Sequence, residues 1–419
     1  MSYIGIMCPN TSGHLNPMIA LADALRTRGH RVTFFLLGDP PASVKTAGFQ
    51  IVLLGGSIFP PDQYRAGLQR LGSLQGRAAL KQTFAMGARA AEAILKVGPT
   101  AARAAGITAL LVDQASFPGG TVADELGIPF ATVCNALLLH SEPTVPPFFT
   151  HWQPQDSWLS RTRTRVAWAG LNRLYAPILT RIQERRRQLG LPIPTQIAAT
   201  WSDRIQISQQ PEAFEFPRQE LPNQLRFVGP LRLPNGYQPV PFPWDRLDSR
   251  PLIYASLGTL QNRVEGTFRT IVDACEGLET QLVISTGHGV APEKLGELPG
   301  HPIIVPYAPQ LDLLSRSALA VTHAGLNTVL DSLSTGVPMV TIPITNEQPG
   351  IAARVAWAGA GENIIPKQLT PERLRAAVVR VRSDSSYRTA AEQIRESIKA
   401  GGGAPRAAAM IEQSLELTL

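Results

Sequence analysis

The chain has 419 residues, of which 44% are hydrophobic and 17% are charged, and its formal net charge is +7 at pH 7. A globular domain usually holds about 100 to 200 residues, so we expect two domains rather than one. The three cysteines, Cys8, Cys134 and Cys275, are scattered, which excludes a disulfide framework or a cysteine metal site. No apolar run approaches the roughly 20 residues of a membrane span and the start lacks a basic signal region, so we expect a soluble, cytoplasmic protein.

The amino-terminal residues predict a strand, a loop and a helix. Residues 4–7 are an apolar strand, and a helical pattern begins at Asn16-Pro17, with proline in the first turn. His14 is expected in the loop just before the helix, where the positive end of the dipole disfavours an imidazolium. His14 is therefore a candidate general base, and a turn histidine that only packs or caps is the plainer alternative.

A carboxylate is predicted close to this histidine. Residues 109–112 form an apolar strand that ends in Asp113. Open α/β folds bind ligands at the carboxyl ends of their strands, and His14 also follows a strand. We expect Asp113 to orient His14 and to stabilise its cation, against the alternative that Asp113 only caps a turn.

Much of the positive charge lies in residues 161–187, where eight arginines alternate with apolar residues at helical spacing. This pattern predicts an amphipathic helix. Such a helix can lie on an anionic membrane, so peripheral membrane contact stays open, although a solvated basic face on a packed helix is commoner. No DNA- or RNA-binding module pattern is present, so we expect no nucleic-acid partner.

Strands and helices alternate along both halves, which predicts an α/β fold, and a proline-rich stretch separates the halves. We divide the chain into an amino-terminal domain (1–230), a linker (231–250) and a carboxy-terminal domain (251–395), followed by a last helical segment (396–419). The second domain begins with a strand at 252–256 that runs into a glycine turn before Thr259.

The strongest local pattern lies between residues 305 and 354. Residues 318–322 predict a buried strand, and apolar residues at helical spacing follow from Leu326. The intervening turn, His323 to Gly325, would gather free N–H groups at a helix N-terminus, which favours a phosphate. Asn327 and Asp331 are four residues apart and share one helix face, where a carboxylate can accept hydrogen bonds from ribose hydroxyls.

This segment closely resembles the donor-binding segment of the family 1, UDP-sugar-dependent glycosyltransferases. The family pattern runs aromatic-x-Pro-Gln, Thr-His-x-Gly-x-Asn-(Ser/Thr), an acidic residue, Gly-Val-Pro and an acid-Gln pair, and its Gly-His-x-x-Pro motif matches residues 13–17. The resemblance implies a GT-B fold, in which two Rossmann-like domains face each other across a cleft and the last helical segment (396–419) packs back on the amino-terminal domain. It also implies inverting transfer of a hexose, with UDP-glucose as co-substrate and no metal or other cofactor; no Asp-x-Asp motif is present.

The resemblance assigns roles to individual residues. His14 would deprotonate the acceptor hydroxyl with the help of Asp113. The donor would be held by Thr259, Tyr307, Ala308, Gln310, His323, Gly325, Asn327, Thr328, Asp331, Glu347 and Gln348. Within this set Tyr307 would stack on the uracil. His323, Asn327 and Thr328 would hold the diphosphate, and Glu347 with Gln348 would contact the transferred sugar. Asp331 stands where many members have Glu, which leaves preference between UDP and dTDP open.

The acceptor is predicted from apolar residues on its side of the cleft. We expect an apolar, hydroxylated small molecule, contacted by Phe59, Phe84, Leu138, Phe148 and Phe149. Residues 348–354 resemble the carotenoid, zeaxanthin-type glucosyltransferases among the bacterial members, and flavonoid- or macrolide-type acceptors are the alternative. Rivals of another class are a nucleotide-sugar epimerase of related fold and an inactive sugar-nucleotide-binding module. We expect a monomer.

Overall fold

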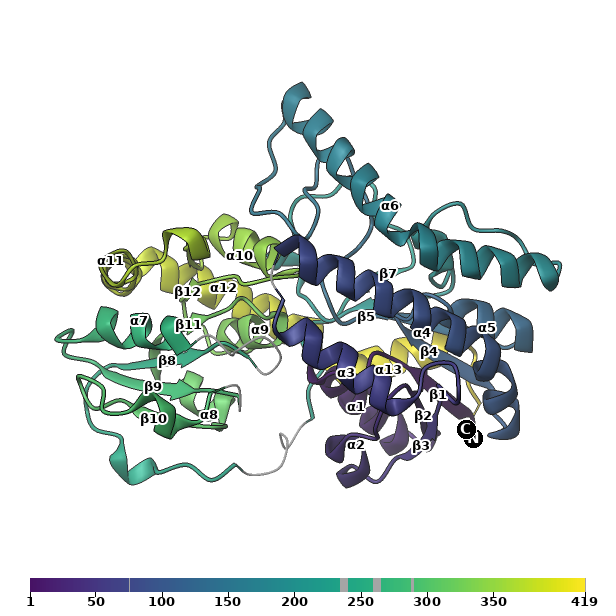
Figure 1. Ribbon diagram of the computed structural model, residues 1–419, viewed down its shortest axis with the longest axis horizontal. Helices are drawn as coiled ribbons and strands as arrows, with labels where there is room; N and C mark the ends of the chain where they lie inside the picture. Colours follow the sequence, from purple (N-terminus) through teal and green to yellow (C-terminus); the bar gives the residue numbers. More distant parts are fainter. Residues whose placement is uncertain (75, 234–239, 259–264, 288–289, 419) are drawn as a thin grey trace.

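The computed structural model of the chain describes residues 1–74, 76–233, 240–258, 265–287 and 290–418. These residues form two parallel-sheet α/β domains, which lie beside each other in Figure 1. The seven-stranded first sheet has the order β3-β2-β1-β4-β5-β6-β7, and the six-stranded second sheet has the order β10-β9-β8-β11-β12-β13. The prediction of two α/β domains is confirmed.

The strands are short apolar runs, most of which are buried because helices cover the sheets. The first sheet contains β1 (Tyr3–Met7), β2 (Arg31–Leu36), β3 (Gln50–Leu53), β4 (Ala109–Asp113), β5 (Phe130–Cys134), β6 (Gln206–Ser208) and β7 (Leu225–Phe227). The second contains β8 (Leu252–Ser256), β9 (Gln281–Ser285), β10 (Ile303–Val305), β11 (Ser317–Thr322), β12 (Met339–Thr341) and β13 (Gly361–Asn363). In each sheet the strand order reverses in the middle, between β1 and β4 and between β8 and β11, and α/β folds bind ligands at such points.

The helices of the first domain are α1 (Ser12–Thr27), α2 (Ala42–Thr46), α3 (Pro61–Gly72), α4 (Gly76–Ala104), α5 (Gly119–Leu126) and α6 (Trp158–Gln188). Those that follow are α7 (Glu265–Cys275), α8 (Gln310–Ser315), α9 (Leu326–Ser334), α10 (Gln348–Trp357), α11 (Pro371–Ser383), α12 (Ser385–Gly401) and α13 (Gly403–Ser414). Among the described residues, no helix is both long and apolar enough to pass through a bilayer.

The start of α1 differs from the sequence-based expectation. The helix begins at Ser12, because the carbonyl of Thr11 already accepts hydrogen bonds from the N–H groups of His14 and Leu15. His14 therefore lies in the first helical turn and not in a loop before the helix. The expectation placed proline in the first turn, whereas Pro17 is the sixth residue of α1.

The last helix returns to the first domain. Gly402 and Gly403 have positive φ angles and turn the chain between α12 and α13. The apolar face of α13, including Ala407 and Ile411, belongs to the same core as β1 and α1. Near the carboxyl end, the carbonyl of Thr418 accepts a hydrogen bond from Ser2 Oγ at 3.1 Å, so the two ends of the described chain lie side by side (Figure 1).

Candidate active site

A histidine and an aspartate meet at the carboxyl edge of the first sheet. β1 and β4 are neighbours, with Met7 paired to Val112, so α1 starts beside the end of β4. His14 Nδ1 lies 2.8 Å from Asp113 Oδ2. Because a carboxylate only accepts, Nδ1 carries the proton and Nε2 is the ring atom that can take one up.

The carboxylate of Asp113 is held by further donors and is fully buried. Asn135 Nδ2 donates to Oδ2 at 2.7 Å, and the N–H of Ala115 donates to Oδ1 at 2.8 Å. The His14 side chain is 24% exposed, so it is the accessible member of the pair. Asn135 follows β5, the strand next to β4. It was not predicted as a site residue, because an Asn after a strand is usually a turn residue.

The pKa of His14 differs from the sequence-based expectation of a neutral imidazole. Burial lowers the pKa of His14, but the charge and hydrogen bond of Asp113, with the charge of Glu347, outweigh it and raise this pKa above its usual 6.5. The helix dipole was expected to keep the imidazole neutral. The nearby carboxylates are the stronger influence, and they make His14 a stronger base.

The turn before α9 is built around His323. A Cβ atom at Gly258 would lie 2.6 Å from His323 Nε2, and one at Gly325 would lie 2.5 Å from it, so the ring requires glycine at both positions. Ala324 has a φ of 63°. Burial lowers the pKa of His323 to about 4, so this imidazole is neutral at pH 7 and keeps one N–H for donation.

Three further residues of the predicted donor site lie together. Gln310 Nε2 donates to Asp331 Oδ2 at 2.5 Å, and Gln310 Oε1 lies 3.5 Å from Thr328 Oγ1. Asp331 also forms an ion pair with Arg232, from the chain that follows β7. Burial raises the pKa of Asp331, against the opposing influence of Arg232 and Gln310.

Arg232 was not predicted as a site residue. It lies within the predicted linker, where a single arginine near prolines gives no local signal. Its guanidinium also donates to Ser334 Oγ at 2.8 Å, so the connection between the domains is attached to α9 at two points.

Asn327 links the two domains. Its Nδ2 donates to the carbonyl of Gly13 at 3.2 Å, and its Oδ1 accepts from Gln209 Nε2 at 3.1 Å. Within α1 the Gly13 carbonyl would bond to the N–H of residue 17, but Pro17 has none. The proline therefore leaves this carbonyl free for Asn327, and the first turns of α1 and α9 lie against each other.

The predicted acid-Gln pair has two different environments. Glu347 Oε2 accepts a hydrogen bond from the N–H of Leu137 at 3.0 Å, so the Glu347 side chain contacts the first domain. Gln348 Oε1 accepts from the N–H groups of Ile344 and Thr345, which directs it to its own loop. Burial raises the pKa of Glu347, opposed by the hydrogen bond from Leu137 and by the charge of His14.

The remaining residues of the predicted donor site lie at the edge of the second sheet. Tyr307 is 42% exposed, as a stacking platform requires, and it follows β10. Ala308 is partly buried against the apolar core of the second domain that contains Leu313 and Leu326. Thr259 lies outside the described residues.

The predicted acceptor residues separate into groups. Phe84, in α4, and Phe148 and Phe149, in the chain before α6, are partly buried against the cluster that contains Trp168 and Tyr175. Phe59 is 1% exposed and Leu138 is 2% exposed, each in a different core cluster. The structure therefore brings three of the five together, and the other two are core residues.

The predicted donor segment and the predicted acceptor segment are in backbone contact. The N–H of Gly350, in the first turn of α10, donates to the carbonyl of Phe148 at 2.8 Å. Farther along α10, the buried Arg354 donates to Glu215 Oε1 at 3.0 Å through Nε. Burial alone would raise the pKa of Glu215, but Arg354 and Arg218 lower it, so the carboxylate is ionised.

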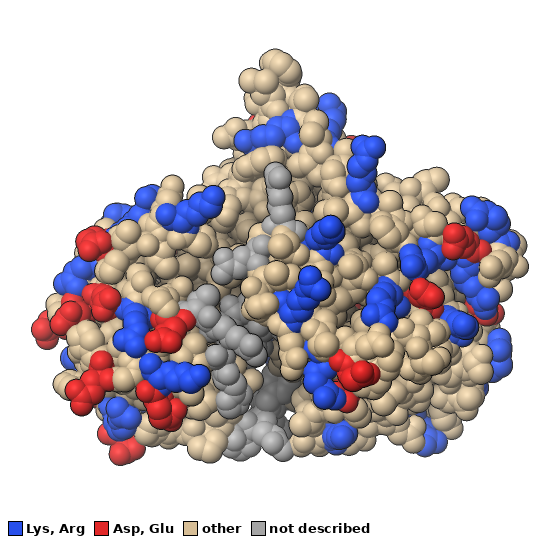
Figure 2. Space-filling model, viewed as in Figure 1, with Lys and Arg blue, Asp and Glu red and all other residues tan. Residues whose placement is uncertain are grey.

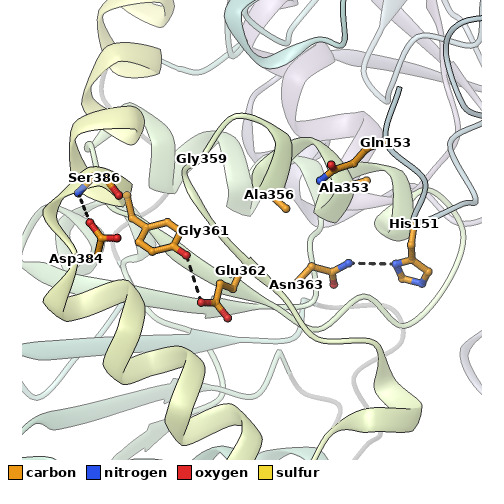
Figure 3. A pocket seen from close by; sticks show the side chains of 11 residues that line it. His151, Gln153, Ala353, Ala356, Gly359, Gly361, Glu362, Asn363, Asp384 and Ser386 are labelled. Carbon is orange, nitrogen blue, oxygen red and sulfur yellow. Dashed lines mark hydrogen bonds between the residues drawn. The ribbon is translucent and has the colours of Figure 1, made fainter. Parts of the chain in front are cut away.

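A surface pocket of about 550 Å³ lies elsewhere, and none of the predicted site residues lines it (Figure 3). His151 and Asn363 bond to each other across one end at 3.2 Å. The two acidic side chains that line the pocket have partners: Glu362 forms an ion pair with Arg380, and Asp384 caps α12. This pocket is separate from the His14–Asp113 pair.

In the part of the chain that the structure describes, no three His, Cys, Asp or Glu side chains gather as metal ligands would.

Sequence comparison relates the chain to glycosyltransferases. Residues 193–397 match the family described as UDP-glucoronosyl and UDP-glucosyl transferase. The zeaxanthin glucosyltransferase of Pantoea ananas is 31% identical, over 99% of this chain and 96% of the relative. That of Pseudescherichia vulneris is 30% identical over 99% and 98%. The 4'-demethylrebeccamycin synthase of Lentzea aerocolonigenes is 28% identical over 96% of both chains.

Solved structures share the fold. The calicheamicin glycosyltransferase CalG4 superposes with a TM-score of 0.75 at 24% identity, over 99% of this chain and 98% of that one. The glycosyltransferase VinC in complex with dTDP gives 0.72 at 21% identity, over 99% and 100%. The predicted GT-B arrangement is confirmed.

Proposed function

The chain belongs to the family 1 UDP-glycosyltransferases, and we propose that it transfers glucose from UDP-glucose to a hydroxyl group of an apolar small molecule, with inversion at the anomeric carbon. The observation that carries this proposal is the 2.8 Å contact between His14 and Asp113 beside the first turn of α9. The contact from Asn327 to Gly13, the neighbour of His14, brings the proposed base and the donor segment together.

In this mechanism His14 Nε2 takes the proton of the acceptor hydroxyl. The hydroxyl oxygen attacks the anomeric carbon, and the bond from that carbon to the diphosphate breaks, so UDP leaves with the electron pair. Asp113 orients the imidazole and stabilises the imidazolium until the proton passes to solvent.

The leaving diphosphate needs positive charge and hydrogen-bond donors. The N-terminus of α9 carries roughly half a positive charge, and His323 and Thr328 add donors. Asp331 and Gln310, bonded to each other, would hold the ribose. No divalent ion takes part in this proposal.

For the acceptor we favour a carotenoid. Two relatives at about this chain's full length are zeaxanthin glucosyltransferases. The aromatic cluster of Phe84, Phe148 and Phe149 supplies apolar surface on the acceptor side. Flavonoid- and macrolide-type acceptors are the alternative within the same reaction.

The test is incubation of the protein with UDP-glucose or dTDP-glucose and a panel that contains zeaxanthin, a flavonoid and a macrolide aglycone, followed by mass analysis of products. We expect glucosides from UDP-glucose, an initial rate nearly unchanged by EDTA, and a loss of roughly 10² to 10⁴-fold in His14→Ala, since general bases typically contribute that much. UDP should still bind to the variant. A changed sugar nucleotide without any acceptor would instead indicate an epimerase.

A further inference from the structure

The amino-terminal end of α6 projects from the molecule. In Figure 1 it rises above both domains at the top of the view, reached by the chain that follows Phe149. Three large apolar side chains near this end are exposed: Trp158 by 74%, Leu159 by 63% and Val166 by 68%. We call this end, residues 158–173, the α6 tip.

Packing against the protein does not explain these exposed side chains. The inner face of α6 carries Trp168, Leu171 and Tyr175, which are buried in the core shared with α4. Leu159 and Val166 are seven residues apart and lie on the opposite, outward face. The outward face of a surface helix is normally polar, so an exposed Trp, Leu and Val together indicate a contact outside the chain.

The charges of α6 divide along its length. Toward the carboxyl end, Arg181, Arg185 and Arg186 form ion pairs with acidic residues of α4 and α5. At the tip, Arg161 pairs with Asp156 and Arg163 lies over the Trp152 ring. Arg165 and Arg173 are exposed and form no ion pair with any described residue.

The tip therefore combines exposed apolar side chains with uncompensated positive charge. Figure 2 shows Lys and Arg side chains around the projection. Tryptophan prefers the interface of a bilayer, and each Arg near an anionic surface adds attraction. A second copy of this chain is a poor occupant, because a two-fold contact would set the same positive groups against each other.

We propose that the α6 tip docks on an anionic lipid surface, with Trp158 and Leu159 inserted among the headgroups and Arg165 and Arg173 against lipid phosphates. Phe148 and Phe149 pack in the same cluster as α6, so docking would bring the acceptor side close to the lipid. This last consequence rests on the proposed function, whereas lipid binding does not.

The test is flotation of the full-length protein with vesicles of phosphatidylcholine, alone or with about a third phosphatidylglycerol. We expect binding to the anionic vesicles, weakened by added salt because the Debye length falls from about 8 Å to 3 Å at 1 M. Trp158→Ser with Leu159→Ser, and separately Arg165→Gln with Arg173→Gln, should each weaken binding by about tenfold or more.

Matched controls separate the tip from general properties of the surface. Leu53→Ser with Val379→Ser removes apolar side chains that are 45% and 42% exposed elsewhere, and should leave vesicle binding unchanged. Arg187→Gln removes an exposed charge at the far end of α6, roughly 30 Å from Arg165 along the helix axis. Wild-type glucosylation of a water-soluble acceptor by the tip variants would show that they are folded.

Equal binding by wild type and tip variants would overturn the proposal, as would equal weakening by the controls. A change of oligomeric state in the tip variants, without vesicle binding by the wild type, would identify the tip as a protein interface and also overturn it. Failure of sugar transfer with intact vesicle binding would contradict the proposed function alone.

Discussion

Asp113 accepts hydrogen bonds from His14, Asn135 and the backbone of Ala115. The hydrogen bonds from Asn135 and Ala115 hold the carboxylate in place. The carboxylate accepts the proton of His14 Nδ1, so the ring is held in one tautomer with Nε2 available. The carboxylate also raises the pKa of His14, which makes the base stronger but keeps it protonated to a higher pH. Orientation and basicity thus depend on one buried charge.

Asp113→Asn tests this dependence, because it keeps the shape of the side chain and removes its charge. The base must be neutral to act, so transfer is lost as the pH falls through the pKa of His14. Without the carboxylate this pKa falls, and the acid limb of the pH profile should move to lower pH while kcat drops by about a hundredfold or more. The pH profiles of kcat and of kcat/KM with a soluble acceptor measure the two effects.

A suitable control is Asp124→Asn, which removes a partly exposed carboxylate paired with Arg186 on the surface of the first domain. Its profile should match the wild type. An acid limb that stays in place in Asp113→Asn would show that His14 does not titrate as the base.

At the scale of elements, much was predictable from local patterns. The apolar runs at 4–7, 109–112, 252–256 and 318–322 correspond to β1, β4, β8 and β11, and the helix after His323 is α9. Buried parallel strands are continuous apolar runs, so composition alone identifies them. The start of α1 was misplaced because Asn16-Pro17 has the composition of a helix start, while the true start has only Thr11 and no side-chain cap.

Contacts between elements were not predictable in the same way. Arg232 with Asp331 and Glu215 with Arg354 join residues far apart in sequence, and neither Arg232 nor Glu215 stands in a recognisable pattern. The proximity of His14 and Asp113 was predictable, because Asp113 ends one strand, His14 follows another, and the carboxyl ends of such strands meet at one edge of the sheet. The additional partners of Asp113 depend on side-chain packing, which a single sequence does not reveal.

Two helical glycines give an element-scale prediction. A Cβ at Gly350 in α10 would lie 2.4 Å from the Phe148 carbonyl oxygen, whereas one at Gly170 in α6 would meet nothing within 4 Å. Gly350→Ala should cost about 1 to 3 kcal/mol of unfolding free energy through overpacking and lower kcat by moving Glu347 and Gln348. Gly170→Ala should stabilise by roughly 0.5 to 1 kcal/mol, because alanine loses less entropy in a helix. Urea unfolding of both variants measures the contrast, and destabilisation of the same size in both would contradict it.

On the scale of the whole molecule, the two domains are joined by several independent contacts. α13 belongs to the core of the first domain, Asn327 bonds to Gly13, and Gly350 bonds to Phe148. The buried ion pair between Glu215 and Arg354 is a further contact between the domains. It is the costliest contact to disturb, since a buried charge that loses its partner is strongly destabilising. Glu215 is central to it, because Arg354 and Arg218 both lie against the same carboxylate.

This arrangement predicts an asymmetry between the partners. Glu215→Gln leaves two buried guanidinium groups without a counter-charge, whereas Arg354→Met leaves Glu215 with Arg218 and with the hydrogen bond from Gln210. We expect Glu215→Gln to lose about 3 to 5 kcal/mol of unfolding free energy and Arg354→Met to lose less, as measured by urea unfolding at pH 7.

The pKa of Glu215 is lowered in the folded protein, so its contribution to stability is present above the unfolded pKa near 4.3 and is lost as the pH falls through the folded pKa. The wild type should therefore approach Glu215→Gln in stability as the solution is acidified, while at pH 7 the two differ most. If Arg354→Met proved the less stable variant at pH 7, or if the difference between wild type and Glu215→Gln did not shrink in acid, the carboxylate would not be the group that balances both arginines.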